Sequence, residues 1–224
     1  MTHALVLATT NRGKLEEIRA LLAGLPLRVY SLDDVLKKKL TIVEDGATFT
    51  DNAVKKATIV ASATMMLTLA DDSGLEVDAL DGAPGVRSAR FAHERATDAE
   101  NNAHLLAALD TLADPTGAAD GTYKARFRCV LALVDPYSHD SEPRIVEGAC
   151  EGAITRTPRG SGGFGYDPLF LVEGTDKTMA ELSPDEKNRV SHRARAVRAL
   201  APILEEIMLA RDVAIDRIAR VSSR

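Results

Sequence analysis

Short apolar runs alternate along the chain with segments in which apolar residues recur at helical spacing. Strands are expected where the runs are continuous and bounded by polar turns, at 4–8, 27–32, 65–70, 75–77, 123–134 and 144–154. Helices are expected where the repeat is helical, at 14–24, 48–68, 97–113 and 183–208. This succession of strands and helices predicts an α/β protein.

Cap and turn residues specify several helix boundaries. The helix at 48–68 is expected to begin with a cap near Thr50 or Asp51. Residues 183–186 read Ser-Pro-Asp-Glu, a capping box with proline at the first helical position, which predicts a helix start. The Asp-Pro-Thr-Gly segment at 114–117 is expected to end the third helix.

Two neighbouring strands are expected to pair as a hairpin. The segment 123–134 alternates polar and apolar residues at first and is fully apolar toward its end, which predicts a strand that passes from a half-exposed to a buried position. Its partner at 144–154 contains Gly148 and Gly152, which indicate bulges or the close approach of another backbone.

Composition favours one soluble domain. At 224 residues, with 45% hydrophobic and 27% charged residues, the chain fits a single domain at 1–210. The charged tail at 211–224 is expected to form a last helical turn or two and then to be disordered. No signal peptide and no apolar run near the roughly 20 residues of a membrane span occur, and the two cysteines, Cys129 and Cys150, lack C-x-x-C spacing. A reduced, cytoplasmic protein without a membrane partner is expected.

The charge of the chain limits its ligands. A net charge of −5 and the absence of Trp argue against nucleic-acid binding. An anionic ligand would therefore need a local cluster of cations, with the help of a metal ion.

Two adjacent carboxylates lie near the centre of the sequence. Asp71 and Asp72 directly follow the apolar run at 65–70 and precede a Ser-Gly pair. Acids at the end of an apolar strand, followed by Gly, suit a metal or phosphate site at the mouth of an α/β sheet. The alternative is a solvated strand end.

The turn after the first strand is a second candidate site. The sequence Thr-Thr-Asn-Arg-Gly-Lys at 9–14 joins an expected strand to an expected helix. Such a turn directs backbone N–H groups and a helix N-terminus outward, and Lys14 adds a positive charge that suits phosphate. It is not a Walker A motif, and an ordinary turn capped by Asn11 is the alternative.

Two further segments carry candidate chemistry. The glycine-rich loop 157–168 also holds aromatic residues, which suits stacking against a flat ring; an Ω-loop that packs its own aromatics is the alternative. Lys187, His192 and Arg193 follow, but at 100° per residue a straight helix would place the second and third about 140° and about 240° from the first. They can converge only if the helix breaks near 189–191, with Ser191 as a second cap; otherwise they are solvated.

Six segments in this order span essentially the whole chain. They are LATTNRGKLEEI at 7–18, EDGATFTDNAVKKA at 44–57, ADDSGLEVDALDGAPGVRSARFA at 70–92, ATDAENNAHLL at 96–106, GGFGYDPLF at 162–170 and AELSPDEKNRVSHRARA at 180–196. Together they resemble the motifs of the noncanonical purine nucleoside triphosphate pyrophosphatases. The chain departs from that family at Asp51, where Glu is usual and a helix cap is affected, and in the tail at 211–224.

The resemblance implies a fold and a reaction. The fold is an elongated mixed β-sheet flanked by helices, with two lobes and the nucleotide in the cleft between them, and the implied assembly is a homodimer. The reaction converts a noncanonical triphosphate (ITP, dITP or XTP) and water to the nucleoside monophosphate and pyrophosphate, with Mg²⁺ as cofactor, and keeps such nucleotides out of DNA and RNA.

The resemblance also implies residue roles. Asp72 is the implied base for the attacking water and holds Mg²⁺ together with Glu44. The triphosphate lies against the turn at 9–14, and the base lies against the loop at 164–167 and the cationic residues that follow it. The implied substrate-binding residues are Thr9, Thr10, Asn11, Arg12, Gly13, Lys14, Lys56, Ser73, Phe164, Gly165, Tyr166, Asp167, Lys187, His192 and Arg193.

Charge and hydrogen-bond polarity agree with these roles. Mg²⁺ and four cations (Lys14, Lys56, Lys187 and Arg193) would balance two carboxylates and a triphosphate of about −4. Donors aimed at a purine 6-oxo group accept hypoxanthine and xanthine but oppose the amino group of adenine, a mismatch that can discriminate by ~10⁴ or more. No residue identifies itself as the group that would exclude guanine.

Two other functions are compatible with the sequence. One is a pyrophosphatase for other modified nucleotides, such as pyrimidine triphosphates, but the loop at 164–167 with His192 and Arg193 favours purines. The other is a module that senses a nucleotide without cleaving it, against which Asp72 and Glu44 count.

Overall fold

A mixed β-sheet forms the centre of the molecule. The computed structural model describes residues 1–224 except 39, 113–120, 139–141 and 223–224. Within these residues the sheet has six strands in the order β2-β1-β3-β4-β5-β6, with β1 parallel to β2 and β3 and the other pairs antiparallel. The strands are β1 (His3–Leu7), β2 (Leu27–Tyr30), β3 (Thr68–Val77), β4 (Tyr123–Val134), β5 (Arg144–Ile154) and β6 (Phe170–Val172). The expected mixed α/β fold is confirmed.

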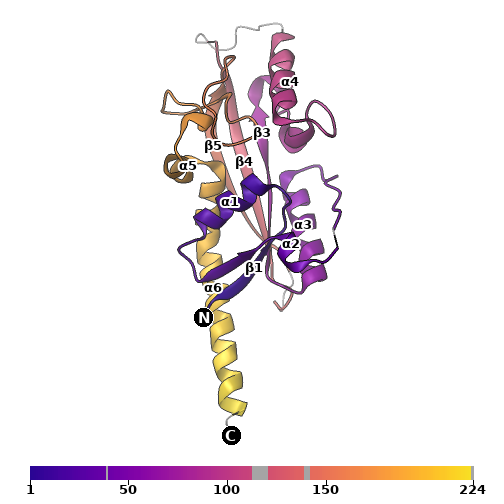
Figure 1. The fold of residues 1–224 in the computed structure, drawn as a ribbon, viewed down its shortest axis with the longest axis vertical. Coiled ribbons are helices and arrows are strands. Elements are labelled where there is room, and N and C mark those ends of the chain that lie inside the picture. Colours follow the sequence, from indigo (N-terminus) through magenta and orange to yellow (C-terminus); the bar gives the residue numbers. More distant parts are fainter. Residues whose placement is uncertain (39, 113–120, 139–141, 223–224) are drawn as a thin grey trace.

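Helices flank this sheet along its length (Figure 1). They are α1 (Arg12–Leu21), α2 (Leu32–Val35), α3 (Phe49–Thr64), α4 (Asp98–Asp110), α5 (Pro184–Val190) and α6 (His192–Ser222), with short 3₁₀ turns η1 (Asp78–Leu80), η2 (Gly85–Arg90) and η3 (Met179–Glu181). Helix α6 runs along the sheet and continues beyond it, so the chain is helical through Ser222 and not only for the turn or two expected after 210. No helix of the described residues is long and apolar enough to cross a membrane.

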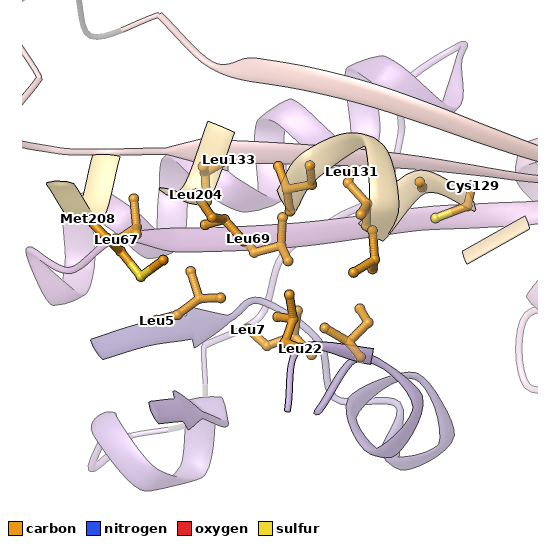
Figure 2. Packing of buried hydrophobic residues seen from close by; sticks show 14 residues of the cluster. Leu5, Leu7, Leu22, Leu67, Leu69, Cys129, Leu131, Leu133, Leu204 and Met208 are labelled. Carbon is orange, nitrogen blue, oxygen red and sulfur yellow. The ribbon is translucent and has the colours of Figure 1, made fainter. Parts of the chain in front are cut away.

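Alternation along the central strands divides the core between the two faces of the sheet. Leu69 of β3 and Leu131 of β4 point to the face covered by α1 and α6, where they pack with Leu204 and Met208 (Figure 2). The residues that alternate with these leucines along each strand, such as Ala70 and Val130, point to the other face, where α3 covers them. The period of two in a strand therefore decides which helix each β3 side chain meets.

The far half of the sheet is covered differently. Its core gathers the inward side chains of β3, β4 and β5 with Leu105 and Leu109 of α4. On the opposite face, Arg126 and Arg128 of β4 form ion pairs with acids of β3 and β5, including Glu76. Strand β4 therefore changes from alternating burial to complete burial toward its end, as its sequence predicted.

The bounds of α3 and β3 differ from the sequence-based expectation in ways that affect the site. Helix α3 ends at Thr64 and begins at the cap Thr48, whose side chain accepts the N–H of Asp51 in a capping box; the predicted caps Thr50 and Asp51 lie inside the helix. Strand β3 is a single strand from Thr68 to Val77, because β4 pairs with it residue by residue over that whole length. The two adjacent carboxylates therefore lie within the strand and not at its end.

The strand glycines mark close approach and not bulges. A Cβ atom at Gly148 would overlap the backbone of α6, and one at Gly152 would overlap Leu171 and Phe170 of β6. The β4–β5 pairing runs through both positions without interruption. The predicted helix-ending segment 114–117 lies outside the described residues.

Candidate active site

The candidate site lies where β3 extends beyond the end of its parallel neighbour, β1. Leu7, the last residue of β1, pairs with Leu69, and the next β3 residues after Ala70 are Asp71 and Asp72. Because neighbouring strand residues point to opposite faces, Asp71 faces α1 and α6, and Asp72 faces α3. The two carboxylates therefore serve two different sets of partners.

One cleft with two hollows lies beside these carboxylates; Asp72 lines one hollow, and Asp71 pairs with Lys14, which borders both. We call the first the aromatic hollow; its walls include Phe127, Phe164, Tyr166, Lys187, His192 and Arg193. We call the second the acidic hollow; its walls include Thr9, Thr10, Glu44, Lys56, Asp72 and Arg90. The hollows share four lining residues, namely Asn11, Lys14, Ser73 and Ala89. A long ligand can therefore occupy both hollows at once.

Asp71 organises the cations between the hollows. Its carboxylate, 1% exposed, pairs with Lys14 Nζ at 2.5 Å and with Arg193 Nε at 2.9 Å, and it accepts hydrogen bonds from the Ser73 hydroxyl and the Cys129 thiol. Burial opposes ionisation of Asp71, but the charges of Arg193 and Lys14 outweigh it and hold its pKa well below the usual value. Asp71 is therefore a fixed negative charge.

Asp72 has the properties of a base. Lys56 Nζ lies 2.6 Å from Asp72 Oδ1 and 3.2 Å from Glu44 Oε2. Burial raises the pKa of Asp72 to about 6, although the Lys56 charge opposes this rise. For Glu44, burial acts in the same direction, but the charge of Lys56 and several hydrogen bonds outweigh it and lower its pKa. A carboxylate with a pKa near 6 is a stronger base than ordinary Asp and is still largely ionised at neutral pH.

The turn at 9–14 fits both interpretations of its sequence. The side chain of Asn11 caps α1 by accepting the N–H of Lys14, as expected for an ordinary capped turn. The same turn lines the acidic hollow through Thr9 and Thr10, with Asn11 and Lys14 bordering both hollows. The Arg12 side chain is 90% exposed and pairs with Glu16, so among these residues it lies away from the cleft.

The glycine-rich loop forms the wall of the aromatic hollow. Asp167 accepts the N–H of Phe164 and pairs with Lys187 Nζ at 2.7 Å, and burial raises its pKa although Lys187 opposes this. The Phe164 ring packs against Gly13, where an added Cβ would lie 2.7 Å from the ring. The Tyr166 hydroxyl donates to the Ser88 carbonyl at 2.8 Å. The loop is therefore attached on both sides of the cleft.

The predicted break before α6 is confirmed. Helix α5 ends at Val190, and Ser191 has an extended backbone, with its hydroxyl accepting the N–H of Ala194. This break brings Lys187, His192 and Arg193 to the same hollow.

His192 is neutral in this environment. Its ring stacks on Phe127 with centroids 4.9 Å apart, and burial together with the nearby Arg193 charge lowers its pKa well below the usual value. Its Nδ1 is buried without a hydrogen-bond partner in the described part of the chain. A ligand in the aromatic hollow can supply that partner.

Three acidic side chains at the cleft have partners that the sequence did not reveal. Glu17 pairs with Lys187 Nζ at 2.7 Å and with Arg193, and it lies three residues after Lys14 on α1, a spacing that places both on one helix face. Asp98 accepts the N–H of Gly165 at 2.7 Å. Asp71 was considered together with Asp72 for a metal or phosphate site but received no role of its own.

The donor set of the acidic hollow fits a small divalent cation. No group of three or more His, Cys, Asp and Glu side chains that could hold a metal ion occurs in the described residues. However, Mg²⁺ is commonly bound by one or two carboxylates together with substrate phosphates. Glu44 and Asp72 are two such carboxylates, and both already converge on one cation, the Lys56 ammonium.

Comparisons with known proteins agree over most of the chain. A model of the Ham1 family matches residues 5–203. The dITP/XTP pyrophosphatase of Desulforamulus reducens is 46% identical over 209 residues, which cover 93% of this chain and 99% of that protein. The dITP/XTP pyrophosphatase of Geobacter sulfurreducens is 48% identical and covers 88% of this chain and 94% of its own length. The structure of a HAM1 protein from Coxiella burnetii matches with a TM-score of 0.78 at 41% identity, over 92% of this chain and all of that chain.

Proposed function

The chain belongs to the Ham1 family, and from this membership we propose that it hydrolyses noncanonical purine nucleoside triphosphates such as dITP, XTP and ITP to the monophosphate and pyrophosphate. One observation carries the proposal: a single cleft joins an aromatic hollow suited to a purine with an acidic hollow suited to a polyphosphate and a cation. The residues common to both hollows include Lys14 and Ser73, at the junction where the α-phosphate of a bound nucleotide would lie.

The aromatic hollow supports selection of a 6-oxopurine. Phe164 offers a ring face, and Lys187 and Arg193 lie 5.2 Å and 5.8 Å from its centroid. These cations and the neutral imidazole of His192 present N–H donors that a 6-oxo group can accept. Adenine would present an amino group instead, and a buried donor facing a donor is costly.

The acidic hollow supports the hydrolytic step. Asp72 would take a proton from a water molecule as the water oxygen attacks the α-phosphorus. The bond between the α-phosphorus and the oxygen that bridges the α- and β-phosphates would break, with pyrophosphate as the leaving group. The Lys56 ammonium lies 2.6 Å from the Asp72 carboxylate and would orient it while also facing the phosphates. Glu44 and Asp72 would hold Mg²⁺, which neutralises developing phosphate charge when bound.

The test is pyrophosphate release from ITP, XTP, dITP, GTP, ATP and dTTP, with and without Mg²⁺. Wild-type protein is expected to release pyrophosphate quickly from the first three, and Asp72→Asn is expected to lose this activity. Asp45→Asn is the matched control, since Asp45 adjoins Glu44 in sequence but is 66% exposed and pairs with Lys55. Rates on GTP and ATP equal to those on ITP, XTP and dITP would contradict the base selectivity. Tight binding of these triphosphates without pyrophosphate release would identify a sensor.

Two further properties belong to this proposal. We expect the protein to act as a homodimer, as the family resemblance implies, and in the cytoplasm, as its sequence led us to expect. Sedimentation of the purified chain tests the first, and fractionation of cells tests the second.

A further inference from the structure

Arg90 lies in the wall of the acidic hollow, where the described residues give it no buried acidic partner. It is the last residue of η2, and its side chain is 23% exposed. Its Nη2 donates to the main-chain carbonyl of Glu44 at 2.7 Å. The only acid it approaches in the described residues is Glu94, 3.7 Å from Nε, and the Glu94 side chain is 75% exposed.

The other cations of the cleft are already neutralised. Lys14 pairs with Asp71, Lys56 with Asp72 and Glu44, Lys187 with Asp167 and Glu17, and Arg193 with Asp71 and Glu17. Four cations thus face five carboxylates in the described part of the cleft. The charge balance expected from the sequence was therefore incomplete, because it omitted Glu17, Asp71 and Asp167. A polyphosphate needs positive charge beyond these four side chains.

We propose that Arg90 binds the polyphosphate of the substrate and the pyrophosphate product; this inference rests on the proposed function. A guanidinium carries five N–H donors in a planar fork that matches phosphate oxygens. Within the described residues, the Glu44 carbonyl is the one hydrogen-bond partner of this side chain. A solvent-exposed ion pair such as that with Glu94 is weak, so a phosphate can replace it.

The contact with Glu44 gives Arg90 a second effect. Residues 41–46 have no helical or strand structure, and the Arg90 bond is one of the few that fix the main chain there, together with the bond from Gly46 N–H to Asn52. Loss of Arg90 would therefore also loosen a carboxylate assigned to Mg²⁺. The two effects can be separated, because only direct phosphate contact operates when the divalent cation is removed.

The experiment is calorimetric titration of inorganic pyrophosphate into the full chain, in Mg²⁺ and in a chelating buffer. Arg90→Ala is expected to weaken binding roughly 10- to 100-fold in both buffers, as for one lost charge-assisted hydrogen-bond pair. Arg90→Lys keeps the charge but not the planar fork of donors, so its pyrophosphate affinity is expected to lie between those of wild type and Arg90→Ala. If Arg90→Ala does not fold, Arg90→Lys tests the inference in its place. Arg87→Ala is the matched control, because Arg87 lies on the same 3₁₀ turn near Glu94 but outside the acidic hollow.

Several results would overturn the inference. They are wild-type-like affinity in Arg90→Ala, an equal loss in Arg87→Ala, no pyrophosphate binding by wild type, or a loss confined to the Mg²⁺ buffer, which would mean that Arg90 acts only through Glu44. Pyrophosphate affinity is measured without turnover. A wild type that binds pyrophosphate through Arg90 yet releases none from any triphosphate would therefore refute the proposed function and leave this inference standing.

Discussion

The buried carboxylate of Asp71 is expected to stabilise the whole cleft. Replacing it in Asp71→Asn leaves Arg193, itself 1% exposed, with Glu17 as its remaining acidic partner, and leaves the Lys14 ammonium without the carboxylate 2.5 Å away. Removing one partner of a buried ion pair costs about 3–5 kcal/mol. For a domain of this size that corresponds to a fall in Tm of roughly 6–20 °C.

Thermal and urea unfolding of wild type, Asp71→Asn and Glu16→Gln would measure this effect. Glu16 is the matched control, because its pair with Arg12 on α1 is exposed and its loss should change the unfolding free energy by less than about 1 kcal/mol. A loss below about 1 kcal/mol in Asp71→Asn as well would refute the reasoning, since it would mean that the two cations do not depend on this carboxylate.

The pH dependence gives a second check on the same residue. The folded-state pKa of Asp71 is depressed, so its stabilisation is complete above the unfolded pKa of about 3.9 and is lost as pH falls through the folded value. Wild type should therefore lose this contribution only in acid, and Asp71→Asn should lack it at neutral pH. The difference in unfolding free energy between the two proteins should shrink as the pH falls below about 4. A constant difference would contradict the assigned ionisation.

Two more substitutions test the aromatic hollow. Gly13→Ala places a Cβ against the Phe164 ring and should raise KM for dITP several-fold, whereas Gly24→Ala, with open space at its Cβ, should leave steady-state kinetics unchanged. Asn102→Ala removes the amide that donates to the Gly165 carbonyl at 3.0 Å. It should raise KM and cost about 1 kcal/mol of transition-state binding, seen as a roughly five-fold lower kcat/KM. Unchanged kinetics would show that Gly165 does not depend on this hydrogen bond.

Local patterns were sufficient for several parts of this fold. Strands β1 to β5 were expected from apolar runs, whereas the short strand β6 was not. Helix geometry predicted the break at Ser191 only on the condition that Lys187 and His192 converge, and the structure meets that condition. The cap of α3 was expected two or three residues too late, at Thr50 or Asp51, because these residues and Thr48 are all good capping residues and only the backbone decides which one has extended geometry.

Other features of the site depend on contacts that sequence distance conceals. The Arg90 bond to Glu44 joins residues 46 apart, and Arg193 reaches Asp71 across 122 residues. Such pairs leave no periodic pattern in the sequence, so the sequence could not identify the acidic partner of each cation; only the fold shows it. Glu17 is the exception, since its spacing from Lys14 on one helix was visible and would have indicated a charge facing the same direction.

The adjacent carboxylates show how one strand serves both halves of the cleft. Had β3 ended at Ala70, Asp71 and Asp72 would have been free to act together as a pair of metal ligands. Because β4 keeps the strand extended, they point to opposite faces, so that Asp71 meets α1 and α6 and Asp72 meets α3. Asp71 stays ionised and holds Arg193 and Lys14, two cations that line the aromatic hollow. Asp72, with a raised pKa beside Lys56, is the one suited to exchange a proton. Strand pairing thus places a carboxylate with a lowered pKa and one with a raised pKa at two consecutive residues, and the second is the one that we propose as the base.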